Sequence, residues 1–429
     1  MNSPVIAFVG MTHLGLNSAV ASANRGFEVL CFDPDPSVVA ALDSGKPMVV
    51  EPDLPEMMAR NRDHITYTSD PRDLVLADVI YIAPDVPTDD RGESDLGSLM
   101  RFVETVDRAA RPDAIVVILS QVPPGFTRSL ARPEATRFYQ VETLVFGRAI
   151  DRAHNPERFI IGAADPAQPL PAPLSAYLAA FDCPILPMRY ESAELSKIAI
   201  NMCLVASVTT ANVLAELCEG IDADWSEIAP ALKLDRRIGP HAYLAAGLGI
   251  AGGNLERDIA TLIRIGARHG TDVAMMQAWR ANSTHRRYWA LHQLHRTVLR
   301  TSSAPVIGVL GLAYKENTHS VKNSPAVALI EGLTPYAIQA YDPVVKADSA
   351  WHPRLRQMPT AIAAAEGVDA LVLMTPWPEF REIDPAELAG RMSGRTVFDP
   401  FGLLDAAGCM TAGLAHLRLG KSVADAPRT

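Results

Sequence analysis

The sequence predicts an α/β protein in which an N-terminal Rossmann-type dinucleotide-binding domain and a C-terminal α/β domain flank a region of long helices. Three observations predict this architecture. Short Val/Ile-rich runs alternate with helical patterns over the first 190 residues, the pattern becomes purely helical after Ser192, and the alternation resumes after Pro305. Alternating strands and helices are typical of a doubly wound sheet. With 429 residues, the chain is long enough for two or three domains of roughly 150 residues.

The N-terminal domain is predicted over residues 1–190. Its strands are expected to be buried and parallel, because the runs that predict them are continuously apolar, as in strands covered by helices on both faces. These strands lie at 5–9, 28–32, 78–83 and 114–119, weaker ones lie at 137–141 and 159–162, and an amphipathic helix lies at 96–111.

Long helices are predicted over residues 191–302. One covers 193–218 almost without a break, and a second candidate covers 272–300. Helices of this length bury against each other or against a second subunit, so this region is expected to be a helical spine that links the two α/β domains. The C-terminal domain is predicted over 303–420, with strands at 306–310, 337–341, 370–374 and 396–398, and residues 421–429 are expected to form a loose polar tail.

Composition narrows the classes of function. Lys and Arg number 39 against 49 Asp and Glu, a net charge of −10, and binding to a nucleic-acid backbone needs a basic field instead. No basic segment precedes a long apolar stretch at the start, and no run approaches the roughly 18 apolar residues of a membrane span. We therefore expect a cytoplasmic protein with neither nucleic acid nor a membrane as partner. The five cysteines are odd in number and widely spaced, which fits neither a disulfide framework nor a metal site.

A dinucleotide fingerprint follows the first predicted strand. Gly10 and Gly15 occupy the first and third glycine positions of the motif, and Thr12 stands in the middle position, where it must shift the loop or use its hydroxyl as a donor. Asp33 ends the next strand, where an acidic residue binds a ribose hydroxyl and repels a 2′-phosphate. The pattern predicts NAD as the cofactor, and a merely structural βαβ unit is the competing interpretation.

Lys197 and Asn201 lie four residues apart on the first long helix, so they share one face. A Lys beside a substrate hydroxyl can orient it and stabilise the developing alkoxide. From the spacing alone, an exposed polar face is the competing interpretation. Glu142 follows a strand end, a usual place for active-site groups, and Lys315 follows the first strand of the C-terminal domain, where a cation could meet a phosphate. Asn254 is read either as a helix N-cap or as a group facing a polar ligand.

These motifs together resemble the UDP-glucose/GDP-mannose dehydrogenase family across almost the whole chain. The matching stretches are 51–54, 86–88, 122–123, 193–201, 237–239, 247–258, 308–315, 323–326 and 340–343. The resemblance implies that Lys197, Asn201 and Asp258 hold the reacting hydroxyl and its water, and that Glu142 assists thioester hydrolysis. It further implies cofactor contacts and nucleotide-sugar contacts. The implied cofactor residues are Thr88, Gln121, Arg257 and Lys322, and the implied substrate residues are Arg237, reaching across a dimer, Tyr243, Gly249, Gly252 and Lys315.

The chain departs from the family's pattern at residues of the reaction centre. Asn254 stands where the family has its nucleophilic cysteine, and a carboxamide cannot form a thioester. Further departures are Gln121 for a threonine, Phe146 for an acidic residue, His319 and Ser320 for two aspartates, Lys322 for an arginine, and Phe401 for an arginine. The sequence therefore predicts an NAD-dependent oxidoreductase that acts on a nucleotide-activated sugar by a single hydride transfer.

Four alternatives remain open from the sequence. The enzyme could return the hydride and act as an epimerase, or it could oxidise an aldehyde hydrate directly to an acid. The chain could instead be a catalytically silent protein that binds NAD or a nucleotide sugar, or a dehydrogenase of small hydroxy acids.

Overall fold

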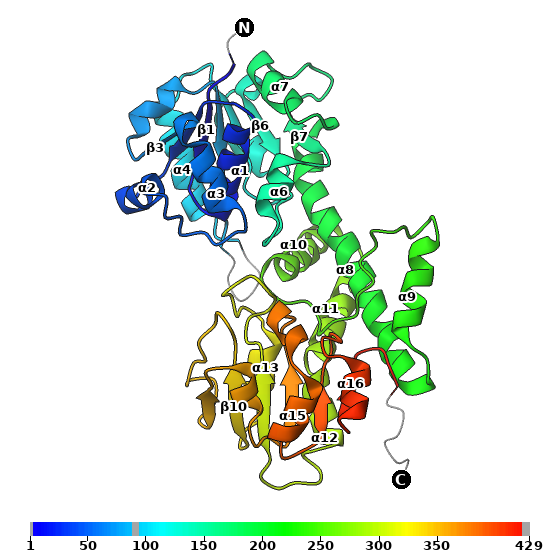
Figure 1. Cartoon of the computed structure of the whole chain (residues 1–429). Helices are drawn as coiled ribbons and strands as arrows, with labels where there is room; N and C mark the ends of the chain where they lie inside the picture. Colours follow the sequence, from blue (N-terminus) through cyan, green and yellow to red (C-terminus); the bar gives the residue numbers. More distant parts are fainter. Residues whose placement is uncertain (1–2, 88–93, 423–429) are drawn as a thin grey trace. The chain divides into compact units, whose positions relative to one another are not determined.

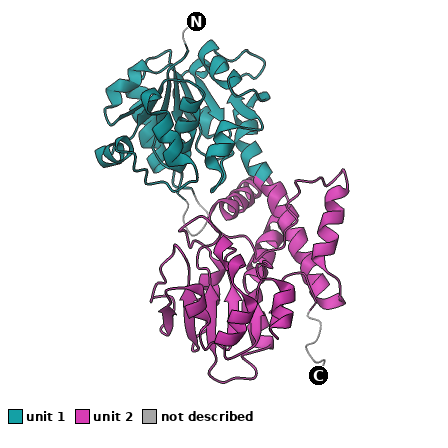
Figure 2. Ribbon diagram, in the orientation of Figure 1, with its two compact units in different colours: residues 1–200 teal, residues 201–429 magenta. Residues whose placement is uncertain are grey.

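The structure, a computed structural model, describes residues 3–87 and 94–422 and divides into two compact units, residues 1–200 and 201–429 (Figures 1 and 2). The division falls within one helix, α8 (Tyr190–Ile221). The other long helices of the middle of the chain belong to the same compact unit as the C-terminal sheet.

The first unit contains an eight-stranded sheet. In spatial order its strands are β3 (Ile65–Thr68), β2 (Val29–Phe32), β1 (Ile6–Val9), β4 (Val79–Ile82), β5 (Ile115–Ile118), β6 (Arg137–Gln140), β7 (Phe159–Ala163) and β8 (Ile185–Arg189). The first six have the order of a dinucleotide-binding sheet, which reverses direction between β1 and β4. All pairs are parallel except β6 with β7, so the expectation of parallel strands is wrong at this pair.

Helices cover both faces of this sheet. On β1, Ile6 and Phe8 belong to one buried cluster and Ala7 and Val9 to another. This two-sided burial explains why the strand reads as a continuous apolar run. The helices are α1 (His13–Asn24), α2 (Pro36–Asp43), α3 (Leu54–Arg60), α4 (Gly97–Ala109), α5 (Phe126–Ser129), α6 (Ala149–His154) and α7 (Ala172–Ala179).

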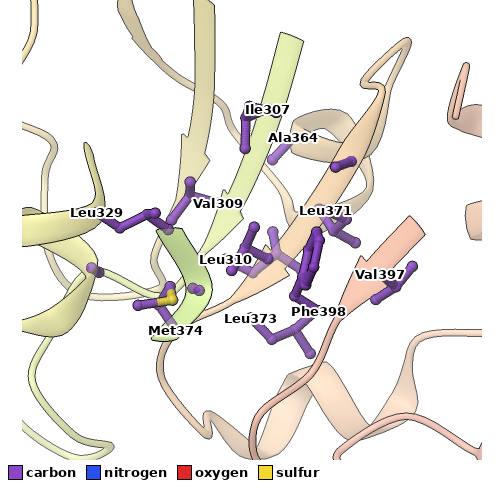
Figure 3. Close-up of a cluster of buried hydrophobic side chains, with 14 of the residues drawn as sticks. Ile307, Val309, Leu310, Leu329, Ala364, Leu371, Leu373, Met374, Val397 and Phe398 are labelled. Atoms are coloured by element: carbon purple, nitrogen blue, oxygen red, sulfur yellow. The ribbon is translucent and has the colours of Figure 1, made fainter. Parts of the chain in front are cut away.

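The second unit contains a six-stranded parallel sheet with the same strand order. Its strands are β11 (Leu355–Gln357), β10 (Ala337–Tyr341), β9 (Val306–Leu310), β12 (Ala370–Leu373), β13 (Thr396–Phe398) and β14 (Ala415–Leu417). Figure 3 shows its core, where Val309, Leu310, Leu371 and Phe398 lie among other buried apolar side chains. The covering helices are α13 (Pro325–Gly332), α14 (Ala361–Ala365), α15 (Pro385–Arg391) and α16 (Ala406–Thr411).

Five helices form the middle of the chain: α8, α9 (Trp225–Leu234), α10 (Asn254–His269), α11 (Ala274–Arg287) and α12 (Trp289–Arg296). The single helix expected over 272–300 is wrong, because the chain leaves helical geometry at Tyr288, with φ −92° and ψ 9°. Arg286 and Trp289, on either side of the break, both contact Glu219 of α8. Tertiary contacts therefore outweigh the local helical pattern here.

Helix α8 is long and apolar enough to cross a membrane by length and composition, with a mean hydropathy of 1.8 in its most apolar window. The expectation that no segment approaches such a span is therefore wrong on these criteria, since 198–215 contains no Asp, Glu, Lys or Arg. A packed helix of a globular protein satisfies the same criteria. Asn201 and Asn212 of α8 are buried and hydrogen-bonded to Asp258 and Gly247, which is the behaviour of a packed helix.

The chain returns to these helices after the last strand. The Gly420 carbonyl accepts a hydrogen bond from the Trp225 amide at 2.8 Å, and Lys421 Nζ lies 3.0 Å from Asp224 Oδ2. Ser422 donates a hydrogen bond to Asp222. The expectation of a loose tail is therefore wrong for residues 421 and 422, and residues 423–429 lie outside the described residues.

Candidate active site

The glycine turn after β1 has the geometry that the fingerprint predicts. Gly10 has a φ of +93°, and a Cβ there would lie 3.0 Å from the backbone nitrogen of Pro84. A Cβ on Gly15 would lie 2.0 Å from the Gly10 carbonyl oxygen, so only glycine lets α1 start this close to β1. The turn is therefore a cradle that a side chain would fill, and its residues fit a dinucleotide at the N-terminus of α1.

Thr12 uses its hydroxyl within the chain. Its Oγ1 accepts a hydrogen bond from the Asp85 amide at 2.8 Å and lies 3.4 Å from the Ala83 carbonyl. Thr12 thus ties the turn after β1 to the turn after β4. The sequence left two possibilities for Thr12, a shifted loop or a hydroxyl used as a donor. In the structure, the hydroxyl accepts a hydrogen bond from the neighbouring loop after β4.

Asp85 places a carboxylate at the start of α1. Its Oδ2 accepts a hydrogen bond from the His13 amide at 3.0 Å, which is one of the free amides that a pyrophosphate would use. Asp85 is exposed when the whole residue is averaged, yet desolvation of the carboxyl group raises its pKa, and the nearby Glu142 adds to the rise while His13 and Thr12 oppose it. No motif in the sequence indicated a role for Asp85.

Asp33 is positioned at the end of β2 as predicted. Its Oδ2 accepts from the Met11 amide at 2.9 Å and its Oδ1 from the Asp35 amide at 3.1 Å. A carboxylate has about four acceptor sites, so these two bonds orient Asp33 and leave capacity for a ribose hydroxyl.

A buried network lies beside this turn. His13 Nε2 is 2.8 Å from Glu51 Oε1, and Glu51 also accepts hydrogen bonds from the Gly147 and Ala149 amides. The His13 ring stacks on Phe146 with ring centroids 4.0 Å apart. Phe146, one of the departures from the family's pattern, therefore packs over an imidazole. His13 and Glu51 were not predicted as site residues.

Lys197 and Glu142 form an ion pair within the first unit. Lys197 Nζ lies 2.7 Å from Glu142 Oε1, and the two side chains are only 12% and 16% exposed. Glu142 Oε2 accepts from the Leu144 amide at 3.0 Å. The alternative of an exposed polar helix face is therefore wrong for Lys197.

Asn201, Asp258 and Arg257 form a second buried group, in the other unit. Asn201 Nδ2 donates to Asp258 Oδ2 at 2.5 Å, and Arg257 Nε lies 3.3 Å from Asp258 Oδ1. Asn201, Arg257 and Asp258 are all buried. Lys197 and Asn201 lie one turn apart on α8. Lys197 contacts the Glu142 carboxylate, and Asn201 donates to the Asp258 carboxylate.

The glycine loop ends in α10, whose first residue is Asn254. The interpretation of Asn254 as the N-cap is wrong, because Gly253 takes that position with near-helical angles of φ −115° and ψ −26°. Among the described residues, the exposed Asn254 carboxamide has no hydrogen-bond partner. It is therefore available to a ligand.

The loop is held by Ser283 of α11, which the sequence did not indicate, and by the chain at Lys322 and Asn323. Ser283 Oγ accepts from the Ile250 amide at 2.7 Å, and a Cβ on Gly249 would lie 2.4 Å from the Ser283 carbonyl oxygen. The Gly252 amide donates to the Lys322 carbonyl at 3.0 Å, and Asn323 bonds both the Gly252 carbonyl and Glu256.

The remaining predicted residues are dispersed. Arg237 pairs with Asp235 at 2.6 Å and its side chain is 88% exposed, and Tyr243 is exposed. Lys315 Nζ lies 5.8 Å from the centre of the Tyr314 ring, in the loop after β9. Gln121 is half-buried beyond β5, and Thr88 lies outside the described residues.

In the second sheet, Asp342 stands at the position that Asp33 has in the first. It follows β10 and is buried. Its Oδ2 accepts from the Leu312 and Ala313 amides and from Trp377 Nε1, and its Oδ1 accepts from the Val344 and Val345 amides. This carboxylate fixes the loop after β9 that carries Lys315.

The glycine cradle, the acidic residue after β2 and the buried Lys and Asn on α8 define a nicotinamide-dependent dehydrogenase. Models of one family match most of the chain: the NAD binding domain matches residues 4–169, the central domain 191–284 and the UDP binding domain 308–406. The chain belongs to the UDP-glucose/GDP-mannose dehydrogenase family. It is an NAD-dependent oxidoreductase of the CH–OH class.

Relatives cover nearly the whole chain. UDP-glucose 6-dehydrogenase TuaD of Bacillus subtilis is 28% identical over 97% of this chain and 93% of its own length. UDP-glucose 6-dehydrogenase of Pseudomonas aeruginosa is 28% identical over 98% and 99%. The solved UDP-glucose dehydrogenase of Pyrobaculum islandicum superposes with a TM-score of 0.83 at 27% identity, covering 93% of this chain and 94% of that one.

Proposed function

We propose that this enzyme oxidises an alcohol carbon of a nucleotide-activated sugar by one hydride transfer, without a thioester intermediate. The observation that carries the proposal is the group at the start of α10. There the buried Asn201–Asp258 pair is retained, with its oxygen and nitrogen 2.5 Å apart, while the helix begins with a carboxamide, Asn254, that has no partner among the described residues.

The buried polar groups suit the first oxidation. When bound, NAD supplies the hydride acceptor. Lys197, which lies 2.7 Å from Glu142, would donate to the substrate hydroxyl and stabilise negative charge on its oxygen. Asn201 would orient the same hydroxyl. Asp258, held by Asn201 and Arg257, would position the water that takes up the proton.

The second oxidation of the family lacks its nucleophile here. None of the five cysteines falls within residues 247–258. Cys203 of α8 is exposed and lies two residues from Asn201, a spacing that places the two side chains on different sides of a helix. Burial raises the pKa of the Cys409 thiol to about 11 and raises that of Cys31 further, so neither is a ready thiolate.

We propose that the substrate is a nucleotide sugar such as the UDP-glucose named in the relatives. Lys315, in the loop that Asp342 fixes, is the cation proposed to meet the diphosphate. Tyr243, Gly249 and Gly252 are proposed to contact the substrate, and Thr88, Gln121 and Lys322 the cofactor.

We also propose a cytoplasmic homodimer. Helices α8 and α9 leave large apolar side chains exposed, among them Leu217 at 54%, Ile221 at 70% and Leu234 at 85%. Contiguous exposed apolar residues mark interaction surfaces. Arg237, exposed and paired only with its neighbour Asp235 among the described residues, would then reach the substrate site of the partner subunit.

The stoichiometry of the reaction tests the single transfer. We expect one NADH formed for each nucleotide sugar consumed, with a carbonyl product identified by mass. Two NADH for each sugar would mean an acid and would defeat the proposal. No NADH with an isomeric product would identify an epimerase, and no turnover on any nucleotide sugar would favour a binding protein.

A further inference from the structure

A polar cavity of about 430 Å³ lies in the second unit, between the end of α8, helices α11 and α12, and the chain after β14. This volume is in the range of small-molecule sites, roughly 300 to 1,000 Å³. Four Arg or Lys side chains and two His line it, against two Glu. The cavity is therefore basic in a chain whose net charge is −10.

Both glutamates are already fully engaged. Glu216 contacts His285 Nε2 at 2.7 Å and Arg286 Nη1 at 3.2 Å. Glu219 accepts from Trp289 Nε1 at 3.0 Å and from the Gly420 amide at 3.0 Å, and Arg286 Nη2 lies 3.5 Å away. These carboxylates therefore have little capacity left for the other cations of the cavity.

Arg286 lines the cavity and is buried. Its side chain is 1% exposed, and among the described residues its Nε and Nη1 have no hydrogen-bond acceptor of good geometry. Its charge is balanced by Glu216 and Glu219, so Arg286 holds these two carboxylates and forms the inner wall of the cavity.

Two further cations add to the positive charge. Arg296 of α12 and Arg418 after β14 line the cavity, and neither has an acidic partner among residues 3–87 and 94–422. Lys421 is neutralised by Asp224 at 3.0 Å. His292, between these groups, has its pKa lowered by burial and then by the nearby His285, Arg296 and His295, which outweigh Glu216. The local potential therefore favours an anion.

The cavity is separate from the catalytic groups of the same unit. Glu216 lies fifteen residues beyond Asn201 on α8, which is roughly 22 Å along a helix. Adjacent residues of α11 face different partners: Arg287 contacts Glu256 near the glycine loop, whereas Arg286 contacts Glu216 and Glu219. Helix α11 thus stands between the glycine loop and the cavity.

We propose that this cavity binds a small polyvalent oxyanion, of the diphosphate kind, with Arg296 and Arg418 as the cations that contact it, while Arg286 keeps Glu216 and Glu219 paired. Guanidinium groups suit phosphate oxygens because they offer paired donors in one plane. The site is independent of the hydride chemistry proposed above.

Calorimetry with inorganic pyrophosphate and the full-length protein tests the site, in the presence of saturating NAD and UDP so that the cofactor and nucleotide positions are filled. We expect one further site per chain. Arg296→Gln and Arg418→Gln should each raise its Kd roughly tenfold or more, while Arg300→Gln, which replaces an exposed arginine beyond the end of α12, should leave it unchanged. All three positions are outside the buried core, so folding is expected to be preserved.

A second readout follows His292 by NMR, since a bound anion should raise its pKa. ADP in place of pyrophosphate separates the sources: equal affinity identifies a free oxyanion, and tighter binding identifies a nucleotide. The proposal is overturned if pyrophosphate does not bind at millimolar concentration even without NAD and UDP, if Arg296→Gln and Arg418→Gln leave its Kd unchanged, or if Arg300→Gln weakens binding as much as the two cavity variants do.

Discussion

Lys197 is the residue on which the proposed hydride transfer depends most. It is 12% exposed and lies 2.7 Å from Glu142, so its charge is held in place before substrate arrives. Preorganised charge of this kind stabilises an alkoxide more than water can.

We expect Lys197→Met to lower kcat by roughly 10²- to 10³-fold while NAD binding stays within a factor of about two. Steady-state NADH formation and NAD titration measure the two effects. Lys233→Met, which removes an exposed lysine of α9, is the matched control. Unchanged turnover in Lys197→Met would exclude this residue from catalysis.

Asn254 lies at the first position of α10, with its carboxamide exposed. We expect Asn254→Cys alone to form no more than traces of sugar acid, because Phe146 stacks on His13 and Gln121 also departs from the family's pattern. Mass spectrometry of the product after exhaustive oxidation gives the answer. Efficient acid formation by this variant would mean that the thiol was the only missing group.

The Asp85 carboxylate accepts a hydrogen bond from the His13 amide at the start of α1, an amide that a bound pyrophosphate would use. Because desolvation raises the pKa of this carboxyl, it takes up a proton at a higher pH than an ordinary carboxyl, and its protonated form does not repel phosphate. We therefore expect NAD affinity to rise as the pH falls through that pKa. Asp85→Asn should bind NAD roughly tenfold more tightly near pH 7.

Calorimetric NAD titrations of both proteins between pH 5 and pH 8 measure this effect. Asp35→Asn, which removes a carboxylate that caps α2 through Ser37, is the control for charge alone. Parallel pH profiles for Asp85→Asn and the unaltered protein would count against the repulsion.

At the scale of elements, the glycine loop before α10 is built against α11. Gly249 has a φ of +85°, and a Cβ would lie 2.4 Å from the Ser283 carbonyl oxygen. We expect Gly249→Ala to destabilise the protein by about 3 kcal/mol through backbone strain and overpacking. Gly247→Ala, where a Cβ would meet nothing within 4 Å, should change stability by less than about 0.5 kcal/mol. Urea unfolding compares them, and equal midpoints would refute the argument.

The sequence could predict the elements whose local pattern and tertiary role agree. β9 lies at the predicted 306–310 and β10 at 337–341, because each is an apolar run between turns. β8 was not predicted. It contains Pro187 and is half-exposed, so its sequence shows neither a continuous apolar run nor an alternation of apolar and polar residues. The break at Tyr288 was not predictable either, since Glu219, which accepts a hydrogen bond from the adjacent Trp289, lies 70 residues away in the chain.

The same distinction applies to the site. Gly10, Gly15 and Asp33 are local motifs, and the structure gives each the predicted geometry. Glu51 and Ser283 act through long-range contacts with His13 and Ile250, and a single sequence carries no spacing rule for such pairs.

For the whole molecule, the exposed apolar side chains of α8 and α9 predict self-association. We expect the unaltered protein to sediment as a dimer and Leu217→Asp/Ile221→Asp to sediment as a monomer with similar helix content, because both side chains are more than half exposed in the single chain. Met410→Asp, on α16 with 76% exposure, should remain dimeric. A monomeric unaltered protein at micromolar concentration would rule the dimer out.

The two sheets share a strand order, but their acidic residues differ in what they can still offer. Asp342 receives five hydrogen bonds and has no lone pair to spare, while Asp33 receives two. A ribose diol arriving at the second sheet would find this carboxylate saturated. Asp342 therefore serves to hold its loops in place, whereas Asp33 can still accept a hydrogen bond from a ligand.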